Sequence, residues 1–246
     1  MKISLITVCF NAGNTLENCI LSVINQNYEQ LEYIIIDGGS TDHTPQIISK
    51  YQSFISHSIS EPDGGLYHAM NKGIALATGK IVGMLNADDY FAHNLVLSNI
   101  SKAFAYHNSD ALYADLQYVK GDKIIRHWKS GNYDIKKWYF GWMPPHPTFY
   151  VKRDLYQKYG NFNLDFRLAA DYELMLRFLL KNRVSVCYLP EVTIKMAVGG
   201  ESNKSLSNRV NANLEDKKAW ITNNLSMPFY LSLLKPLRKI GQFIFK

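Results

Sequence analysis

The first hundred residues alternate between short apolar runs and longer, more polar segments. The apolar runs predict buried strands. They cover residues 3–9, 33–37, 55–60 and 81–85. Helix-capping residues such as Thr15 and Asp42 begin the first polar segments, and a further helix is expected over 66–77. Because strands and helices alternate in this order, we expect an α/β fold with a doubly wound, mostly parallel central sheet.

The pattern changes after Asp110, where the candidate elements become shorter and a proline-rich loop occupies 143–147. The expected strands cover 111–119 and 123–127, and the expected helices lie near 152–159 and 170–182. We therefore expect an α+β extension beside the parallel sheet, followed by C-terminal helices. A chain of 246 residues can bury a full core as one large domain, with or without an appendage.

Cysteine content and hydropathy indicate a cytoplasmic protein. The three cysteines, Cys9, Cys19 and Cys187, are too few and too scattered for a disulfide framework or a zinc site, which fits a reducing compartment. The apolar run at the N-terminus is too short for a signal peptide, and no later run reaches the length of a transmembrane helix. We therefore expect neither export nor passage through a bilayer.

Charge is unevenly distributed along the chain, whose formal net charge is +6. Residues 1–100 carry four lysines against nine acidic residues, whereas residues 101–246 carry 23 basic residues against 12 acidic ones. An acidic half does not suit phosphate binding unless a metal intervenes. The basic half suits an anionic acceptor or a lipid surface. Because no nucleic-acid-binding motif accompanies it, we expect no nucleic acid partner.

Two adjacent carboxylates, Asp88 and Asp89, follow the apolar run that ends at Leu85. They lie at the carboxyl end of a predicted strand, which is where open α/β sheets place their ligands. Hard oxygen donors suit Mg²⁺ or Mn²⁺, with phosphate and water completing the shell. The pair could instead start a turn or cap the helix expected from about Ala92. These residues alone leave both interpretations open.

The first strand-to-helix turn excludes two common nucleotide-binding folds. A Rossmann site needs a G-x-G-x-x-G sequence there, and a P-loop needs a glycine-rich loop that ends in Gly-Lys-Ser or Gly-Lys-Thr. Residues 10–15 read Phe-Asn-Ala-Gly-Asn-Thr instead. Neither fold fits this turn.

Seven short segments, in this order, resemble the family 2 glycosyltransferases. They lie at 6–11, 34–42, 61–73, 85–89, 145–148, 162–165 and 169–174, within a resemblance that spans about residues 3–185. Its specificity comes from the order and spacing of the segments rather than from any one of them. The resemblance implies an inverting, metal-dependent enzyme with the GT-A fold, which uses Mn²⁺ or Mg²⁺ and a nucleotide-diphosphate sugar donor.

The resemblance also implies which residues bind the donor. Asp37, after the second strand, is expected to accept a hydrogen bond from the nucleotide base, although it could simply form a turn. Thr7 and Asn11 are expected to line the base pocket or, alternatively, to shape a capped turn. Asp63 and Lys72 flank a helix expected to face the nucleotide, with Lys72 on a phosphate or, alternatively, in solvent.

The expected metal ligands depart from the family's common Asp-x-Asp pattern, because Asn86 occupies the first position. An amide can bond a ribose hydroxyl or ligate weakly, but it carries no charge. Asp88 is therefore expected to be the main metal ligand, with Asp89 as helper. His146, held between two prolines, is expected to touch the diphosphate or the acceptor, or to be structural.

Asp171 resembles the family's catalytic base, in an Ala-Asp pair where many relatives have Glu-Asp. A sugar hydroxyl is a poor nucleophile, so a carboxylate that takes its proton typically accelerates the attack by about 10²–10⁴-fold. Asp171 could also cap the helix that follows it. Glu173 and Arg177 fit an ordinary i,i+4 ion pair on that helix.

The segment 227–246 mixes large apolar residues with four cations and no acid. This composition is typical of an interfacial anchor, in which apolar side chains enter the headgroup boundary and cations meet anionic lipid. A terminal helix packed on the domain fits the sequence equally well.

The resemblance thus implies an inverting glycosyltransferase of surface polysaccharide synthesis, with a saccharide or polyprenyl-linked acceptor. We expect residues 1–105 to bind the nucleotide sugar, 106–205 to supply the acceptor side and the base, and 206–246 to form helices that could associate with a membrane. Such a protein would be cytoplasmic or peripheral on the inner face of the plasma membrane. A catalytically silent nucleotide-sugar-binding scaffold is the alternative, because Asn86 and Ala170 depart from the family pattern.

Overall fold

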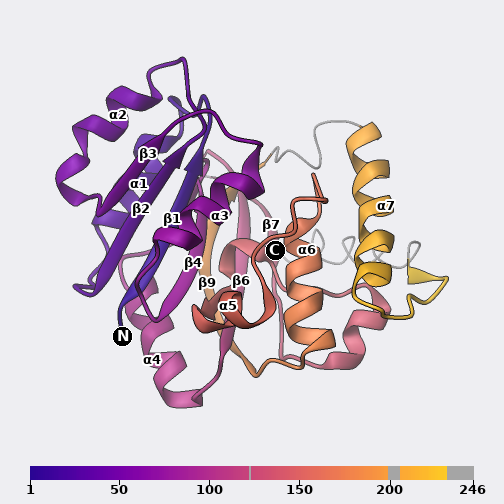
Figure 1. Cartoon of the computed structure of the whole chain (residues 1–246). Helices are drawn as coiled ribbons and strands as arrows, with labels where there is room; N and C mark the ends of the chain where they lie inside the picture. Colours follow the sequence, from indigo (N-terminus) through magenta and orange to yellow (C-terminus); the bar gives the residue numbers. More distant parts are fainter. Residues whose placement is uncertain (122, 199–205, 232–246) are drawn as a thin grey trace.

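The computed structural model describes residues 1–121, 123–198 and 206–231, which form a mixed α/β structure around one curled sheet (Figure 1). Its strands are β1 (Ile3–Cys9), β2 (Leu31–Asp37), β3 (His57–Ser60), β4 (Ile81–Asn86), β5 (Asp89–Phe91), β6 (Ala111–Lys120), β7 (Lys123–Trp128), β8 (Tyr150–Lys152) and β9 (Val186–Ala197). Its α-helices are α1 (Leu16–Ile24), α2 (Thr44–Lys50), α3 (Leu66–Leu76), α4 (Val96–His107), α5 (Asp154–Tyr159), α6 (Ala170–Met175) and α7 (Leu206–Thr222). Shorter helical turns are η1 (Gln52–Phe54), η2 (Ile135–Phe140), η3 (His146–Thr148) and the π-helical η4 (Leu176–Lys181).

Strand order and direction divide the sheet into two parallel blocks. The order is β3-β2-β1-β4-β8-β6-β9-β5, and β7 pairs with β6 outside this path. Strands β3, β2, β1 and β4 run parallel to one another, and β6 runs parallel to β9. The antiparallel strand β8 joins the two blocks, since it pairs with both β4 and β6. The expected α/β class with a mostly parallel central sheet is confirmed.

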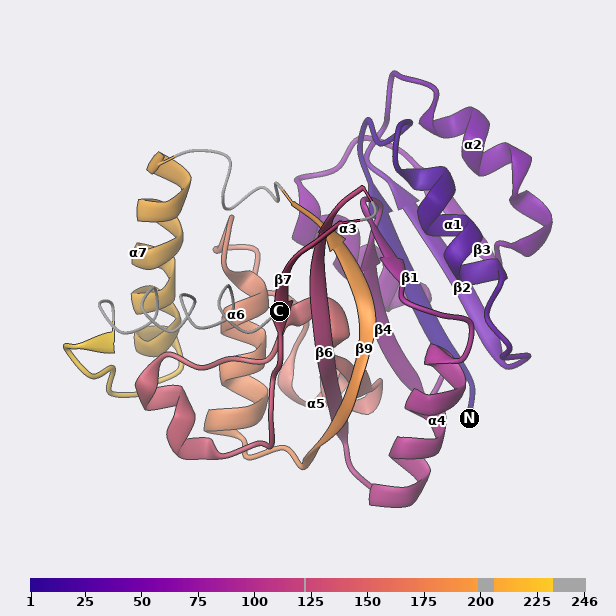
Figure 2. The same ribbon diagram turned by 180° about the vertical axis from the view of Figure 1, so that it is seen from behind.

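Helices cover both faces of the sheet, and each face has its own apolar core. Helices α3, α5 and α6 pack on one face, and α1, α2 and α4 pack on the other (Figure 1 and, from behind, Figure 2). Every residue of β1 is buried. Ile6 and Val8 belong to the first core, whereas Leu5 and Cys9 belong to the second. Burial on both faces explains why this strand is a continuous apolar run in the sequence.

The sequence pattern does not reveal β5, β8 or the long strand β9. Pro190 and Glu191 interrupt the apolar character of β9. In the structure both lie where the register between β6 and β9 shifts, between the paired residues Leu189 and Val192. Such an irregularity frees the proline from donating a ladder hydrogen bond, so the strand continues past it.

The described C-terminal part consists of α7 and the residues up to 231. Leu231 is buried, and Leu225 and Met227 pack against the same core as α6. Most of the segment 227–246, namely residues 232–246, lies outside the described residues. No helix in the described part of the chain is long and apolar enough to cross a bilayer.

Candidate active site

Three parallel strands end side by side at one edge of the sheet. The register pairs Cys9 of β1 with Asp37 of β2, and Val8 of β1 with Asn86 of β4. The carboxyl ends of these strands therefore meet, and the polar residues that end or follow them share one edge. This is the edge at which open α/β sheets bind ligands.

Asp37 holds the loops at this edge together. Its side chain is fully buried and accepts hydrogen bonds from the hydroxyl groups of Ser40 and Ser60, each at 2.5 Å. The backbone N–H of Ser40 also donates to this carboxylate, at 3.2 Å. Asp37 therefore has no surface open to a ligand in this structure, and a nucleotide base could reach it only if Ser40 moved aside.

The loop after β1 presents an exposed aromatic ring beside a carboxylate. Phe10 is 65% exposed. Asn11 has a φ of +48°, and its Oδ1 accepts a hydrogen bond from the N–H of Thr41 at 2.9 Å, which ties this loop to the loop after β2. A Cβ placed on Gly38 would lie 3.1 Å from Asp63 Oδ2 and 3.4 Å from the ring of Phe10. Phe10 and Asp63 therefore converge on the backbone of Gly38.

Two residues expected to bind the donor have protein partners. Thr7 is fully buried, and its hydroxyl accepts a hydrogen bond from Tyr33 at 3.2 Å. Lys72 forms an ion pair with Glu61 at 2.8 Å, and 18% of its side chain is exposed. Thr7 thus offers no surface to a ligand in this structure, whereas Lys72 could exchange Glu61 for a phosphate.

The acid pair after β4 has one exposed and one buried member. Asp88 is exposed, whereas Asp89 begins β5 and is fully buried. The amide of Asn86 donates to Asp89 Oδ2 at 3.1 Å. Burial, and then the negative charge of Asp88, raise the pKa of Asp89 well above its usual value.

Two oxygens of this group, Asn86 Oδ1 and Asp89 Oδ1, are buried and have no hydrogen-bond partner among the described residues. Buried polar atoms are normally satisfied, so these oxygens are suited to a cation or a water molecule. With the Asp88 carboxylate they form a set of hard oxygen donors, the type that Mg²⁺ and Mn²⁺ prefer. In the described part of the chain, no three His, Cys, Asp or Glu side chains cluster to hold a metal. Phosphate and water would have to complete the shell.

Asp171 lies in the first turn of α6 and contacts Tyr67 in the first turn of α3. The Tyr67 hydroxyl donates a hydrogen bond to Asp171 Oδ1 at 3.0 Å. Burial, and then the charge of Asp171, raise the pKa of Tyr67 well above its usual value, so the phenol keeps its proton. Oδ2 of Asp171 accepts no hydrogen bond from the described residues, which leaves it free for an incoming hydroxyl.

The Tyr67 contact places Asp171 at the same edge as the strand ends. Helix α3 begins at Leu66, soon after β3 ends, and β3 runs parallel to β2. The N-cap of α6 is Ala169, so Asp171 does not cap this helix. The carboxylate is therefore available for chemistry.

His146 belongs to the same aromatic cluster as Tyr67. It is buried, and its ring meets Phe162 edge to face at 5.6 Å, while Phe162 stacks on Tyr67 at 5.5 Å. Burial lowers the pKa of His146, and the negative charge of Asp171 acts in the opposite direction. A buried imidazole held neutral in this way can either donate or accept a hydrogen bond.

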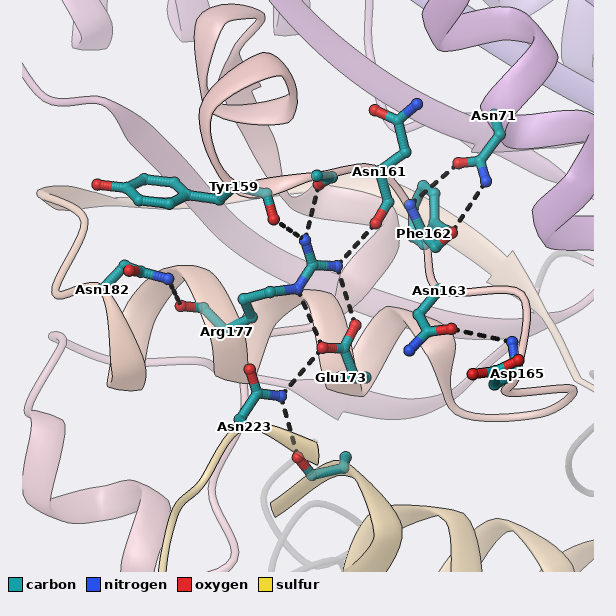
Figure 3. A network of polar contacts seen from close by, with 12 residues as sticks. Asn71, Tyr159, Asn161, Phe162, Asn163, Asp165, Glu173, Arg177, Asn182 and Asn223 are labelled. Carbon is teal, nitrogen blue, oxygen red and sulfur yellow. Dashed lines mark hydrogen bonds and ion pairs between the residues drawn. The ribbon is translucent and has the colours of Figure 1, made fainter. Parts of the chain in front are cut away.

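A buried ion pair anchors the helix that carries Asp171 (Figure 3). Glu173 accepts two hydrogen bonds from the Arg177 guanidinium, at 3.0 and 2.9 Å. The same guanidinium donates to the backbone carbonyls of residues 159–161, and Asn223 donates to Glu173 Oε1 at 3.0 Å. The expected i,i+4 pair is thus the centre of a network that joins α6, the loop after α5 and the end of α7.

Sequence comparison identifies the family. The family model described as "Glycosyl transferase family 2" matches residues 4–170. An uncharacterised glycosyltransferase of Mycobacterium tuberculosis is 32% identical over 183 residues, which cover 72% of this chain and 69% of the relative. A PGL/p-HBAD biosynthesis glycosyltransferase of Mycobacterium bovis is 29% identical over 208 residues, which cover 81% of this chain and 78% of the relative.

Solved structures of low sequence identity share the fold. S. aureus TarS 1-349 in complex with UDP-GlcNAc gives a TM-score of 0.69 at 19% identity, over 99% of this chain and 79% of TarS. The mannosyltransferase PcManGT from Pyrobaculum calidifontis, in complex with GDP-Man and Mn²⁺, gives 0.68 at 19% identity, over 97% of this chain and 69% of PcManGT. The chain therefore belongs to glycosyl transferase family 2 and has the GT-A fold, and the expected glycosyltransferase class is confirmed.

Phe10 and Tyr67 lie among the polar residues of this edge, but the sequence pattern does not point to either of them. Phe10 directly follows a buried strand and precedes Asn11, and an aromatic residue at a strand exit is a signal that could have been used. Tyr67 carries no such signal. Its partner Asp171 is 104 residues away, and only the tertiary fold brings the two together.

Proposed function

We propose that this protein is an inverting glycosyltransferase that moves a sugar from a nucleotide-diphosphate donor to a saccharide or lipid-linked saccharide. The observation that carries the proposal is the hydrogen bond between Tyr67 and Asp171. This bond supports a role for the Asp171 carboxylate as a base, oriented at the sheet edge where acidic and polar residues lie together. The structural neighbours in complex with UDP-GlcNAc and with GDP-Man support a donor of this class.

The donor would bind across the ends of β1, β2 and β4. The nucleotide base of the donor would stack on Phe10, which is exposed beside Asp63. Aromatic rings pair in offset or edge-to-face arrangements. Asp37 would accept a hydrogen bond from the base once the Ser40 hydroxyl gives way, and Asn11 would hold the loop in place. Lys72 would exchange Glu61 for a phosphate oxygen.

Asp88 would be the main protein ligand of a Mn²⁺ or Mg²⁺ ion, supported by Asp89 and Asn86. Two buried oxygens that have no hydrogen-bond partner in the described structure, together with the exposed Asp88 carboxylate, support this assignment. A bound cation would offset the negative charge that develops on the diphosphate leaving group.

In the proposed reaction, Asp171 Oδ2 accepts the proton of the acceptor hydroxyl while that oxygen forms a bond to the anomeric carbon. The bond between the anomeric carbon and the diphosphate oxygen breaks, and the diphosphate leaves with the electron pair. Attack from the opposite side inverts the anomeric configuration. Tyr67 fixes the orientation of the carboxylate, and base catalysis of this kind typically contributes about 10²–10⁴-fold.

Two measurements on the purified protein distinguish an active enzyme from a catalytically silent scaffold. A thermal-shift screen of UDP and GDP sugars with and without Mn²⁺ identifies the donor, because a ligand that binds the folded state raises its apparent stability. Release of the nucleoside diphosphate from that donor is then followed with candidate acceptors. We expect turnover that depends on the acceptor, whereas donor binding with no release or transfer would favour the scaffold.

The C-terminal segment supports a second part of the proposal, which is contact with the inner membrane surface. Phe229 is 94% exposed and Ile221 is 65% exposed, and Phe140 of η2 stacks on Tyr230 at 6.3 Å. Exposed aromatic and aliphatic side chains of this kind suit a headgroup boundary. The cations of 232–246 follow directly in the sequence.

The test is co-sedimentation with vesicles that contain anionic lipid. Truncation after Leu231 removes the cationic tail and keeps the buried Leu231. We expect this truncation and Phe229→Ser to bind anionic vesicles less than the wild type does, with neutral vesicles as the control for lipid charge. Unchanged binding of both variants would contradict membrane contact.

A further inference from the structure

We propose that Glu215 of α7 is a positioning residue for Asp171, so that the C-terminal helix controls how well the base is aligned for the reaction. This inference rests on the proposed role of Asp171. It concerns a residue outside the segments that suggested the family.

Glu215 binds three successive backbone N–H groups directly before α6. Its Oε1 accepts from Arg167 at 3.0 Å, and its Oε2 accepts from Leu168 and Ala169, each at 2.8 Å. Successive N–H groups of this kind form an anion-binding concavity, and hydrogen bonds to a carboxylate are stronger than those between neutral groups. Ala169 is the N-cap of α6 and has no polar side chain. A carboxylate from a distant helix therefore fixes the backbone two residues before the base.

Other contacts from the end of α7 hold both sides of the base. Lys218 Nζ donates to the carbonyl of Asp165 at 2.8 Å. The indole N–H of Trp220 donates to the Tyr172 hydroxyl at 2.8 Å, and Trp220 is fully buried. Asn223 donates to Glu173, which is itself bound to Arg177 (Figure 3). Figure 1 shows α7 lying alongside α6.

These contacts bracket Asp171 in sequence, at residues 165–169 and 172–173, while the Asp171 side chain bonds only to α3 through Tyr67 among the described residues. The negative charge of Glu215 also contributes, after burial and Asp171, to the raised pKa of Tyr67. A misplacement of about 1 Å at a reacting group can cost about 10²-fold in rate. Loss of the Glu215 contacts should therefore reduce turnover more than donor binding.

The test compares Glu215→Gln with Glu191→Gln, using the donor and acceptor found for the intact chain. Glutamine has one acceptor oxygen and an NH₂ group that cannot accept from an N–H. Glu191 is a matched control, because its carboxylate accepts two hydrogen bonds from Asn99 and pairs with His93 away from the base. We expect Glu215→Gln to lower kcat by about 10-fold or more while the donor Kd changes less than about twofold. Glu191→Gln should change neither.

A wild-type kcat in Glu215→Gln overturns the inference, and so does an equal loss of kcat and donor affinity, which would indicate general destabilisation. If Glu215→Gln does not fold, Trp220→Phe tests the same idea, since it removes the bond to Tyr172 and keeps an aromatic ring. The same split between kcat and donor Kd is expected, and a wild-type kcat overturns the inference. Full activity of Asp171→Asn would instead refute the proposed base itself.

Discussion

The hydroxyl of Tyr67 lies 3.0 Å from Asp171 Oδ1 and donates a hydrogen bond to it. This bond joins the first turn of α3 to the first turn of α6. It uses one carboxylate oxygen and leaves the other for an incoming hydroxyl. The two helices therefore define the orientation of the proposed base before any substrate binds.

Tyr67→Phe removes this hydrogen bond and keeps the stacking on Phe162. We expect kcat to fall by about 10- to 10²-fold, because a hydrogen bond to a charged group contributes about 1.5–3 kcal/mol. The donor Kd should stay within about twofold, since the bond orients the proposed catalytic carboxylate and not the donor. Tyr28→Phe is the control, because it removes a hydroxyl that bonds Ser101 elsewhere in the molecule. Equal effects of the two variants on kcat would argue against a role for Tyr67.

Phe10→Leu should weaken donor binding, because it removes the exposed ring beside Asp63. An aromatic pair contributes about 0.5–1.5 kcal/mol beyond its buried area, which corresponds to about 2- to 13-fold in the donor Kd. Phe54→Leu is a matched control, since Phe54 is 58% exposed and lies in η1. Calorimetric titration with the donor measures both. An unchanged donor Kd in Phe10→Leu would show that the nucleotide base does not stack on Phe10.

Asp89→Asn should stabilise the metal-free protein at neutral pH. Burial and the charge of Asp88 raise the pKa of Asp89, so its ionised form is costly in the fold and the neutral amide removes that cost. The melting temperature should rise by about 2–4 °C for each kcal/mol removed. The further rise in melting temperature that Mn²⁺ causes in the presence of donor should be smaller than in the wild type.

Asp88→Asn is the companion variant, because Asp88 is exposed. It should leave the melting temperature of the metal-free protein unchanged. Like Asp89→Asn, it should reduce the rise in melting temperature that Mn²⁺ causes in the presence of donor. A full Mn²⁺ response in both variants would show that the cation binds somewhere else.

Glu32 gives the fold a pH dependence at the opposite end of β1. Burial alone would raise its pKa, but hydrogen bonds from Lys2, Ser4 and Thr78 outweigh burial and hold the pKa at about 2, below its ordinary 4.5. A depressed carboxyl pKa stabilises the fold above pH 4.5, and this contribution disappears as the pH falls towards 2. Glu32→Gln should therefore lower the free energy of unfolding at pH 7 by about 2–3 kcal/mol, with the difference from wild type vanishing near pH 2.

Urea unfolding at pH 7, 4 and 2.5 checks this prediction. Glu17→Gln is the control, since Glu17 forms an exposed pair with Lys50 and should change stability little at any pH. A constant difference between Glu32→Gln and wild type across this pH range would contradict the assignment.

The strands that build the site could be predicted because they are buried on both faces. In β1, β2 and β4, that burial produces continuous apolar runs, and the polar residues at their ends mark the edge. The strand β9 could not be predicted in the same way, because Pro190 falls at a register shift that exists only once β6 is paired with it.

The site itself was only partly predictable from the sequence. Asp88 and Asp171 stand in recognisable segments, but the burial of Asp89 depends on β5 pairing with β9. Tyr67, which bonds the proposed base, and Glu215, which bonds the backbone before it, come from helices far away in the chain. Local sequence contains no information on such contacts, since they depend on how the helices pack.

The most direct test of the central claim is the transfer rate of Asp171→Asn, measured together with its donor Kd. Asp165→Asn is the matched control, because it changes a nearby carboxylate whose residue contacts α7 through its backbone carbonyl. We predict that Asp171→Asn lowers kcat by about 10²-fold or more and leaves the donor Kd within about twofold, while Asp165→Asn behaves as wild type. Transfer by Asp171→Asn at the wild-type rate would contradict the account.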